Sequence, residues 1–383
     1  MMNNKTIAFI ANFTGIFLFG ISMVIIGSIL PVLKSKFGMT EIEAGKLFSI
    51  LPIGLLAGSI SFGPIVDKFG YRWVLALASA FLGVGFLGIA HSSSVALLSL
   101  FIFFFGVGGG TINGGTSALV SDLSEGKGKI INLNWLGLFY GVGAFSMPLV
   151  LSIVSEEYLI PILNITALLS IISAIAFLVI KYPLTVQKEK ITIKLVPTFV
   201  KNKLFMIIAF YLFFQSAFEA IVNNWSVSYF INVHAVEQSK ALVALSYSVL
   251  GLIIMRLLVG SFLKNLNHNR LIMISLILLL LGAFGLLMDG YIINSAGMML
   301  LGAGLAPGFP VMLGLVGEMF KETSGTAFSF VMLIALTGNT IINYLTGVIT
   351  NYIGMQAYVY IVFSVVFFMM FIYLLIRKKE NTN

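Results

Sequence analysis

The sequence is a succession of long apolar runs, and this feature restricts the chain to a membrane. About 20 consecutive apolar residues cross the hydrocarbon core of a bilayer as one helix. Only 9% of the 383 residues are charged, against roughly 25% in soluble domains. We therefore expect an all-α membrane protein with 12 transmembrane helices. The predicted spans are 6–31, 43–66, 71–91, 94–120, 132–154, 158–181, 202–231, 239–263, 270–288, 291–317, 323–350 and 355–376.

Short similarities between the two parts of the chain predict two pseudo-symmetric six-helix halves. Gly106-Val-Gly108 aligns with Gly302-Ala-Gly304 at an offset of 196 residues, and the segment Gly63–Lys68 aligns with Gly260–Asn265 at an offset of 197. Repeats of this kind are typical of duplicated membrane folds. We predict an N-terminal half over residues 1–182, a cytoplasmic linker over 183–201 and a C-terminal half over 202–383.

The distribution of Lys and Arg predicts the orientation. With an even number of spans, both termini lie on one side of the membrane. Of the 22 Lys and Arg residues, 17 fall on the side of the termini, four fall on the other side, and Arg256 lies within a span. Basic residues are enriched in cytoplasmic loops. Both termini are therefore predicted to be cytoplasmic, and the short loops favour a bacterial inner membrane as the location.

One cytoplasmic loop carries a motif that resembles a family signature. Residues 63–72 read Gly63-Pro-Ile-Val-Asp67-Lys68-Phe-Gly70-Tyr-Arg72. This segment resembles G-x-x-x-D-[RK]-x-G-[RK]-[RK], the loop between the second and third helices of the major facilitator superfamily. Tyr71 departs from the pattern by replacing a basic residue. The resemblance implies the major facilitator fold and secondary transport by alternating access.

The residues of this signature loop (63–72) are predicted to form a gate. Gly63 would let a neighbouring helix approach closely. Asp67 would accept hydrogen bonds at the positive N-terminus of the span that starts near Thr323–Gly325, a pairing that the family resemblance implies. Lys68, Gly70 and Arg72 complete the candidate gate. The alternative is an ordinary tight turn with solvated charges.

Further segments resemble the sugar porters, in particular the fucose–glucose–galactose symporter branch. They are residues 106–118, 132–144, 215–225 and 302–310. In that branch an acidic residue lies four positions before the proline that closes the first span, and Pro31 places Gly27 there. A second acid of the branch aligns with Asn113. The familiar proton-coupling acids are therefore missing from both positions.

A polar stripe within the span 202–231 provides the strongest candidates for binding and coupling. Gln215, Glu219 and Asn223 are spaced at i, i+4 and i+8, so they share one helix face. Glu219 is the only carboxylate deep in a predicted span, where burial is expensive unless the group is protonated, paired or hydrated. We predict sugar binding by this stripe and ion coupling by Glu219 and Arg256. The alternatives are a hydrogen-bonded helix seam for the stripe and snorkelling to the interface for Arg256.

Six other residues are candidates for substrate contact. Trp225 and Trp135 have rings that could stack on a sugar, although both could instead anchor at the interface. The other four candidates are Asn113, Asn134, Asn339 and Asn343. Their amides can donate hydrogen bonds to hydroxyl groups and accept hydrogen bonds from them, and an amide exposed to lipid is energetically costly. We therefore expect each of them to contact either the substrate or another helix.

Other classes of function have little support in the sequence. There is no Cys, no Gly-Lys-Ser/Thr phosphate loop and no cluster with metal-ligand spacing. We predict no enzyme activity, no cofactor, no bound metal and no nucleic-acid partner. The predicted function is uptake of a sugar or similar small neutral polar solute by a monomer, with H⁺ or Na⁺ as candidate coupling ions. The alternative is efflux of drugs or amphipathic metabolites.

Overall fold

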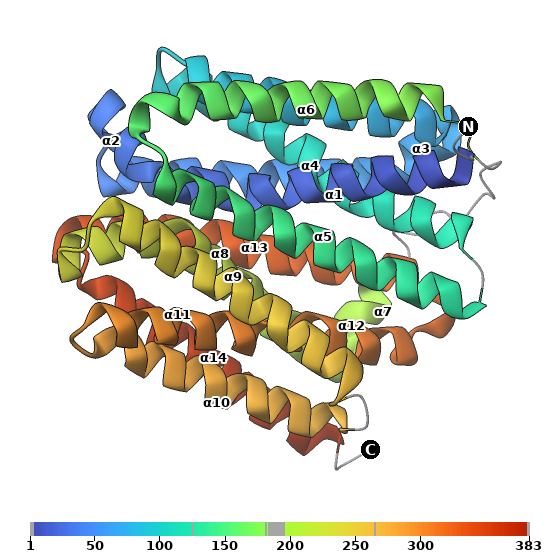
Figure 1. Cartoon of the computed structure of the whole chain (residues 1–383). Coiled ribbons are helices and arrows are strands. Elements are labelled where there is room, and N and C mark those ends of the chain that lie inside the picture. Colours follow the sequence, from blue (N-terminus) through green and yellow to red (C-terminus); the bar gives the residue numbers. More distant parts are fainter. Residues whose placement is uncertain (1–3, 125, 181, 183–195, 264–265, 381–383) are drawn as a thin grey trace. The chain divides into compact units, whose positions relative to one another are not determined.

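The computed structural model describes residues 4–124, 126–180, 182, 196–263 and 266–380, which are almost entirely helical (Figure 1). Within these residues, 12 helical stretches are long and apolar enough to cross a membrane. They coincide with the 12 predicted spans, so the predicted all-α membrane fold is confirmed.

Most spans correspond to one helix each. In chain order the α-helices are α1 (Asn4–Ser28), α2 (Leu30–Phe37), α3 (Glu41–His91), α4 (Val95–Leu123), α5 (Gly126–Ile153), α6 (Leu159–Val179), α7 (Val196–Lys201), α8 (Lys203–His234), α9 (Gln238–Ser261), α10 (His268–Leu287), α11 (Tyr291–Leu305), α12 (Gly308–Met319), α13 (Ser324–Ile353) and α14 (Ala357–Glu380). Two 3₁₀ turns, η1 (Glu156–Tyr158) and η3 (Lys321–Thr323), precede α6 and α13.

Proline and glycine explain where the helices depart from the predicted spans. The predicted span 291–317 is divided between α11 and α12, because Pro307 and Pro310 lack the N–H groups that would continue the helix. The short helix α2 has Pro31 in its first turn and ends at Gly38, whose φ of 62° is left-handed. Two predicted spans, 43–66 and 71–91, form the single element α3, which is interrupted only at Gly70.

The chain groups into two compact units. Unit 1 comprises the described parts of Met1–Ile26, Ser35–Phe37 and Ile50–Lys190, and unit 2 comprises Gly27–Lys34, Gly38–Ser49 and the described part of Ile191–Asn383. The segments Gly27–Lys34 and Gly38–Ser49, called here the outer junction, therefore group with the C-terminal helices. Most of the predicted linker, residues 183–195, lies outside the described residues, and its end forms α7. The predicted division at 183–201 stays a prediction.

In unit 1, the glycine-rich helix α4 lies in direct contact with the backbone of α3. A Cβ atom built on Gly106 would lie 2.5 Å from the carbonyl oxygen of Leu51, and one built on Gly108 would lie 2.6 Å from that of Ala78. Only glycine allows the two helices to lie this close, because a real Cβ atom is essentially never found within 3.0 Å of another heavy atom in this way. The glycines of α4 are therefore explained by helix packing inside unit 1.

Unit 2 repeats this arrangement at the aligned positions. A Cβ atom on Gly302 of α11 would overlap the carbonyl oxygen of Ser248 in α9, and one on Gly304 would lie 2.7 Å from the side chain of Leu279 in α10. Helix α11 packs against both α9 and α10. The sequence similarity at an offset of about 196 residues thus corresponds to the same packing in each unit, as expected of a duplicated fold.

Candidate functional site

The predicted polar stripe lies on α8, a helix of 32 residues in unit 2. Asn202 caps the start of α8 by accepting a hydrogen bond from the backbone N–H of Phe205 at 3.1 Å. Gln215 and Asn223 are buried, and Glu219 between them is partly buried. The stripe therefore faces protein rather than the outer surface of unit 2. A lipid-facing orientation, which would have removed it as a candidate site, is not observed.

Gln215 lies against the break between α11 and α12. Its Nε2 donates to the carbonyl oxygen of Leu305, the last residue of α11, at 3.1 Å. A Cβ atom on Gly308 would overlap the Gln215 amide, so glycine leaves room for it at the start of α12. The Gln215 Oε1 is buried and accepts no hydrogen bond from the described residues. Leaving a buried amide oxygen without a hydrogen bond is energetically costly, so a solute group that donates a hydrogen bond to it would bind favourably.

Asn343 of α13 is the centre of a buried amide network. Its Oδ1 accepts from Asn224 Nδ2 at 3.1 Å and from Trp225 Nε1 at 3.2 Å. Its Nδ2 donates to the carbonyl oxygen and to the Oδ1 of Asn339, both at 2.9 Å. The structure therefore brings together three predicted residues, Trp225, Asn339 and Asn343, and adds Asn224. Sequence reasoning missed Asn224, because helical spacing places it off the stripe. Its position next to the predicted residue Asn223 was a signal that could have found it.

The ring of Trp225 is enclosed by protein. Trp225 is fully buried, and its ring meets the ring of Phe48 edge to face, with centroids 5.1 Å apart. Phe48 belongs to the outer junction. In this conformation the indole has a hydrogen-bond partner and an aromatic neighbour, so its surface is not open to a solute.

The outer junction packs closely on α8 and α13. A Cβ atom on Gly27 would overlap the carbonyl oxygen of Asn223. One on Gly45 would lie 3.1 Å from the carbonyl oxygen of Asn343. Ser49 Oγ donates to the carbonyl oxygen of Thr340 at 2.8 Å. At Gly27, the position that the sugar-porter resemblance assigns to an acid, this conformation thus has no space for any side chain.

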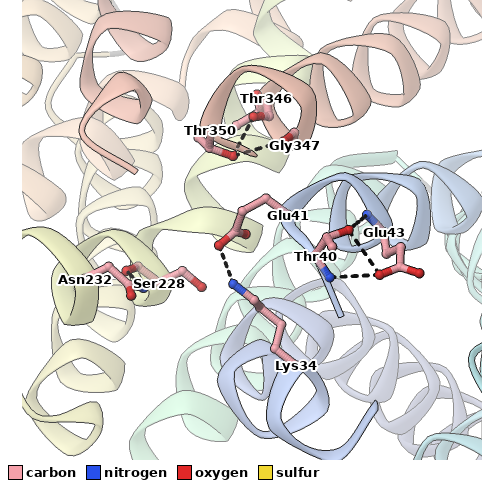
Figure 2. Close-up of polar contacts among 9 residues, drawn as sticks. All are labelled: Lys34, Thr40, Glu41, Glu43, Ser228, Asn232, Thr346, Gly347 and Thr350. Atoms are coloured by element: carbon pink, nitrogen blue, oxygen red, sulfur yellow. Dashed lines mark hydrogen bonds and ion pairs between the residues drawn. The ribbon is translucent and has the colours of Figure 1, made fainter. Parts of the chain in front are cut away.

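Figure 2 shows an ion pair within the outer junction that the sequence did not indicate. Lys34 of α2 and Glu41 at the start of α3 point toward one another and form an ion pair. The second carboxylate oxygen of Glu41 is buried and lacks a hydrogen-bond partner among the described residues. The backbone of Glu41 lies against α13, because a Cβ atom on Gly347 would lie 2.5 Å from the carbonyl oxygen of Glu41. Figure 2 also labels Thr346, Gly347 and Thr350 of α13, and Ser228 and Asn232 of α8.

The remaining candidates are described within the unit to which each belongs. Asn113 on α4, and Asn134 and Trp135 on α5, belong to unit 1 and are exposed. The ring of Trp135 contacts Phe139 at a centroid distance of 6.5 Å. Arg256 on α9 belongs to unit 2 and is partly buried.

In the signature loop, the backbone conformation at position 70 explains why the residue there is glycine. Its φ of 74° and ψ of 167° interrupt α3, and such a positive φ strongly favours glycine. Lys68 and Arg72 are exposed, with their cationic groups 5.1 and 5.4 Å from the ring centroids of the next residues, Phe69 and Trp73. The side chain of Asp67 lies outside the described structure.

The close helix approach expected at Gly63 is not made in this conformation. A Cβ atom built on Gly63 would meet no described atom within 4 Å. The role expected of Gly63 therefore stays a prediction. Tyr71, in contrast, is buried, and its hydroxyl donates to Asp122 Oδ2 at the end of α4 at 2.6 Å. The residue that departs from the family pattern thus has a specific partner.

Comparison with known proteins gives the chain a family context. A model described as Major Facilitator Superfamily matches residues 13–299. The inner membrane transport protein YdiN of Escherichia coli (strain K12) is 23% identical over 349 residues, covering 89% of this chain and 82% of YdiN. The glucose/mannose transporter GlcP of Bacillus subtilis (strain 168) is 22% identical over 345 residues, covering 86% of this chain and 85% of GlcP.

Solved structures show the same fold. A crystal structure of the nucleoside transporter NupG, carrying one substitution, superposes with a TM-score of 0.82 at 16% identity, covering 98% of this chain and 99% of that one. At this identity the likeness concerns the fold alone.

Proposed function

Because the chain belongs to the Major Facilitator Superfamily, whose members are transporters and not enzymes, we propose that it takes up a sugar or a similar small neutral polar solute by alternating access. The transported solute is its proposed small-molecule partner, and the lipid bilayer is its surroundings. A glucose/mannose transporter among its relatives supports the substrate class. We further propose a bacterial inner membrane location, cytoplasmic termini and a monomeric state.

The observation that supports the substrate class is the pair of amides that flank Glu219 on the α8 face. Gln215 and Asn223 present amides, which both donate to and accept from hydroxyl groups. Gln215 is held at the α11–α12 break by Leu305, so its Oε1 has a fixed direction. A solute hydroxyl can donate to this oxygen once the site opens, whereas a carboxylate or phosphate cannot. We keep Asn113, Asn134, Trp135, Trp225, Asn339 and Asn343 as proposed contributors to the same substrate pathway.

For ion coupling, we propose Glu219 with Arg256. Glu219 lies one helical turn from Gln215 on the proposed binding face, so a change in its charge would be felt at the solute site. Gly27 and Asn113 occupy the positions where the resembling branch carries acids. Coupling to H⁺ or Na⁺ through those positions is therefore not expected, and Glu219 remains as the intramembrane carboxylate.

For gating, we propose that Asp67 of the signature loop binds at the N-terminus of α13 when the cytoplasmic side closes. Helix α13 begins at Ser324, immediately after the 3₁₀ turn η3, so its first N–H groups are available to an acceptor. Gly63, Lys68, Gly70 and Arg72 would shape and position the loop. Closure of the opposite side would use the outer junction, through the contacts of Gly27 and Gly45 described above.

Ligand-induced thermal stabilisation of the purified protein tests the substrate class. At about 100 times the Kd, a ligand stabilises the folded state by about 2.7 kcal/mol. We expect one or more neutral hexoses, pentoses or nucleosides to raise the unfolding temperature. Gln215→Leu should abolish this shift, while Gln356→Leu, at an exposed position, should not. If only amphipathic drugs stabilise the protein, the efflux alternative replaces this proposal.

A further inference from the structure

Tyr182 directly precedes residues 183–195, which lie outside the described structure, and it is anchored in unit 1. Its hydroxyl donates to the carbonyl oxygen of Phe177 near the end of α6 at 2.8 Å. Burial raises the pKa of this phenol, with Arg72 acting in the opposite direction, so the hydroxyl stays protonated as a donor. The ring stacks on the ring of Tyr71, with centroids 6.1 Å apart and planes inclined by 28°.

Tyr71 is itself the anchor of the signature loop. It follows Gly70, is 3% exposed and donates to Asp122 Oδ2 at 2.6 Å. Its ring also lies 6.4 Å from that of Phe62. The end of the N-terminal half therefore rests on the residue that fixes the signature loop to α4.

Phe199 plays the corresponding part in unit 2. It is fully buried although its neighbours Pro197, Thr198 and Val200 on α7 are exposed. Three rings surround the ring of Phe199. Their centroid distances are 5.2 Å for Phe205 of α8, 5.0 Å for Phe320, which lies between α12 and η3, and 6.0 Å for Phe330 of α13. A short helix with one buried ring is held in place mainly by that ring.

Phe320 places this aromatic cluster at the second element of the proposed gate. Phe320 follows α12 directly and precedes η3, after which α13 begins at Ser324. The N-terminus of α13 is the proposed binding position for Asp67. The described residues that flank positions 183–195 therefore contact the two elements that the gate is proposed to join, one in each unit.

We propose that Tyr182 and Phe199 are positioning residues of the cytoplasmic gate: Tyr182 holds the signature loop through Tyr71, and Phe199 holds the α12–α13 turn through Phe320. This inference rests on the proposed gating role of Asp67. Losing either ring leaves its gate element in more than one position, so the closed gate becomes less populated. We expect substrate binding on α8 to be unaffected, because Phe205, the α8 residue that Phe199 contacts, lies almost three helical turns from Gln215.

The absence of cysteine from the sequence allows a clean test. Gly325 on the first turn of α13 is exposed, and a Cβ there meets no described atom within 4 Å. A Gly325→Cys reporter would be covered when the gate closes. In proteoliposomes we expect Tyr182→Ala and Phe199→Ala each to raise the rate of maleimide labelling roughly fivefold. Val200→Ala, an exposed neighbour on α7, is the matched control and should leave the rate unchanged.

Companion variants separate positioning from folding and from the gate itself. Tyr182→Phe keeps the stacked ring and should label like the wild type, and both Ala variants should keep the ligand affinity while the maximal transport rate falls. If the Ala variants do not accumulate, Tyr182→Leu and Phe199→Leu replace them with the same expectation.

The two proposals fail in different ways. If Asp67→Asn leaves the labelling of Gly325→Cys unchanged, the proposed gate is wrong. If Asp67→Asn raises it but the ring variants label like Val200→Ala, the gate stands and the present inference is overturned. A loss of ligand binding together with faster labelling in the ring variants would also overturn it, because that pattern reports general unfolding.

Discussion

At the scale of single residues, Asn343 shows how a buried amide can serve the fold and the proposed transport pathway together. Every donor and acceptor position that its amide usually provides is engaged by Asn224, Trp225 or Asn339. An unpartnered buried donor destabilises by about 1–3 kcal/mol. The side chain therefore fixes the indole of Trp225 as well as filling space between α8 and α13.

We expect Asn343→Leu to lower the stability of the purified protein by about 2–4 kcal/mol, since two donors lose their acceptor. The measurement is the midpoint of thermal unfolding in detergent. Asn351→Leu, at an exposed position on the same helix, is the control and should change the midpoint little. Equal shifts for the two variants would show that the network does not carry stability.

The sequence could indicate which residues are polar and inward-facing, but not which of them meet. Gln215 and Asn223 follow from helical periodicity, and the structure buries both. The enclosure of Trp225 could not be predicted, because its partners Phe48 and Asn343 are more than 100 residues away. The ion pair of Lys34 with Glu41 was also missed, since charges near span ends are usually solvated.

At the scale of helices, backbone contacts decide where glycine is required. Gly347 of α13 is an example, because a Cβ there would lie 2.5 Å from the carbonyl oxygen of Glu41 and 2.8 Å from the Cα of Gly45. Hydropathy predicted the spans well because length and apolarity suffice for that purpose. It did not predict α2 or the division between α11 and α12, although Pro31, Pro307 and Pro310 were visible signals.

Gly347→Ala should prevent the outer junction from seating on α13, because the added methyl group overlaps the backbone of α3. In the cysteine-free chain, we expect a Ser228→Cys reporter to react several-fold faster with a membrane-impermeant maleimide in this variant. Ser228 is 2% exposed in the observed conformation. Gly314→Ala on α12, where a Cβ meets no described atom within 4 Å, is the control. Unchanged labelling in Gly347→Ala would mean that this contact does not close the outer side.

At the scale of the whole molecule, the 12 spans and the distribution of basic residues predict one orientation. Cysteine introduced at Lys379, the last residue of the final span, should react with an impermeant reagent only after the cells are opened. Cysteine introduced at Asp289, between α10 and α11, should react in intact cells. The reverse pattern would place the signature loop outside and would remove it as a cytoplasmic gate.

The duplicated packing of α4 and α11 supports the family assignment independently of sequence identity, since both helices use glycines at aligned positions. What transport requires beyond the fold is a binding face and a source of energy. We propose the α8 stripe as the binding face and Glu219 as the group that couples transport to an ion gradient, which would provide the energy.

The most direct test of this account is gradient-driven uptake of a stabilising sugar by proteoliposomes, measured for the wild type and for Glu219→Gln. We expect the wild type to accumulate the sugar under an inward H⁺ or Na⁺ gradient. Glu219→Gln should only exchange it across the membrane without accumulation, and the exposed-site control Glu237→Gln should behave like the wild type. Absence of sugar transport by the wild type, or gradient-driven accumulation by Glu219→Gln, would contradict it.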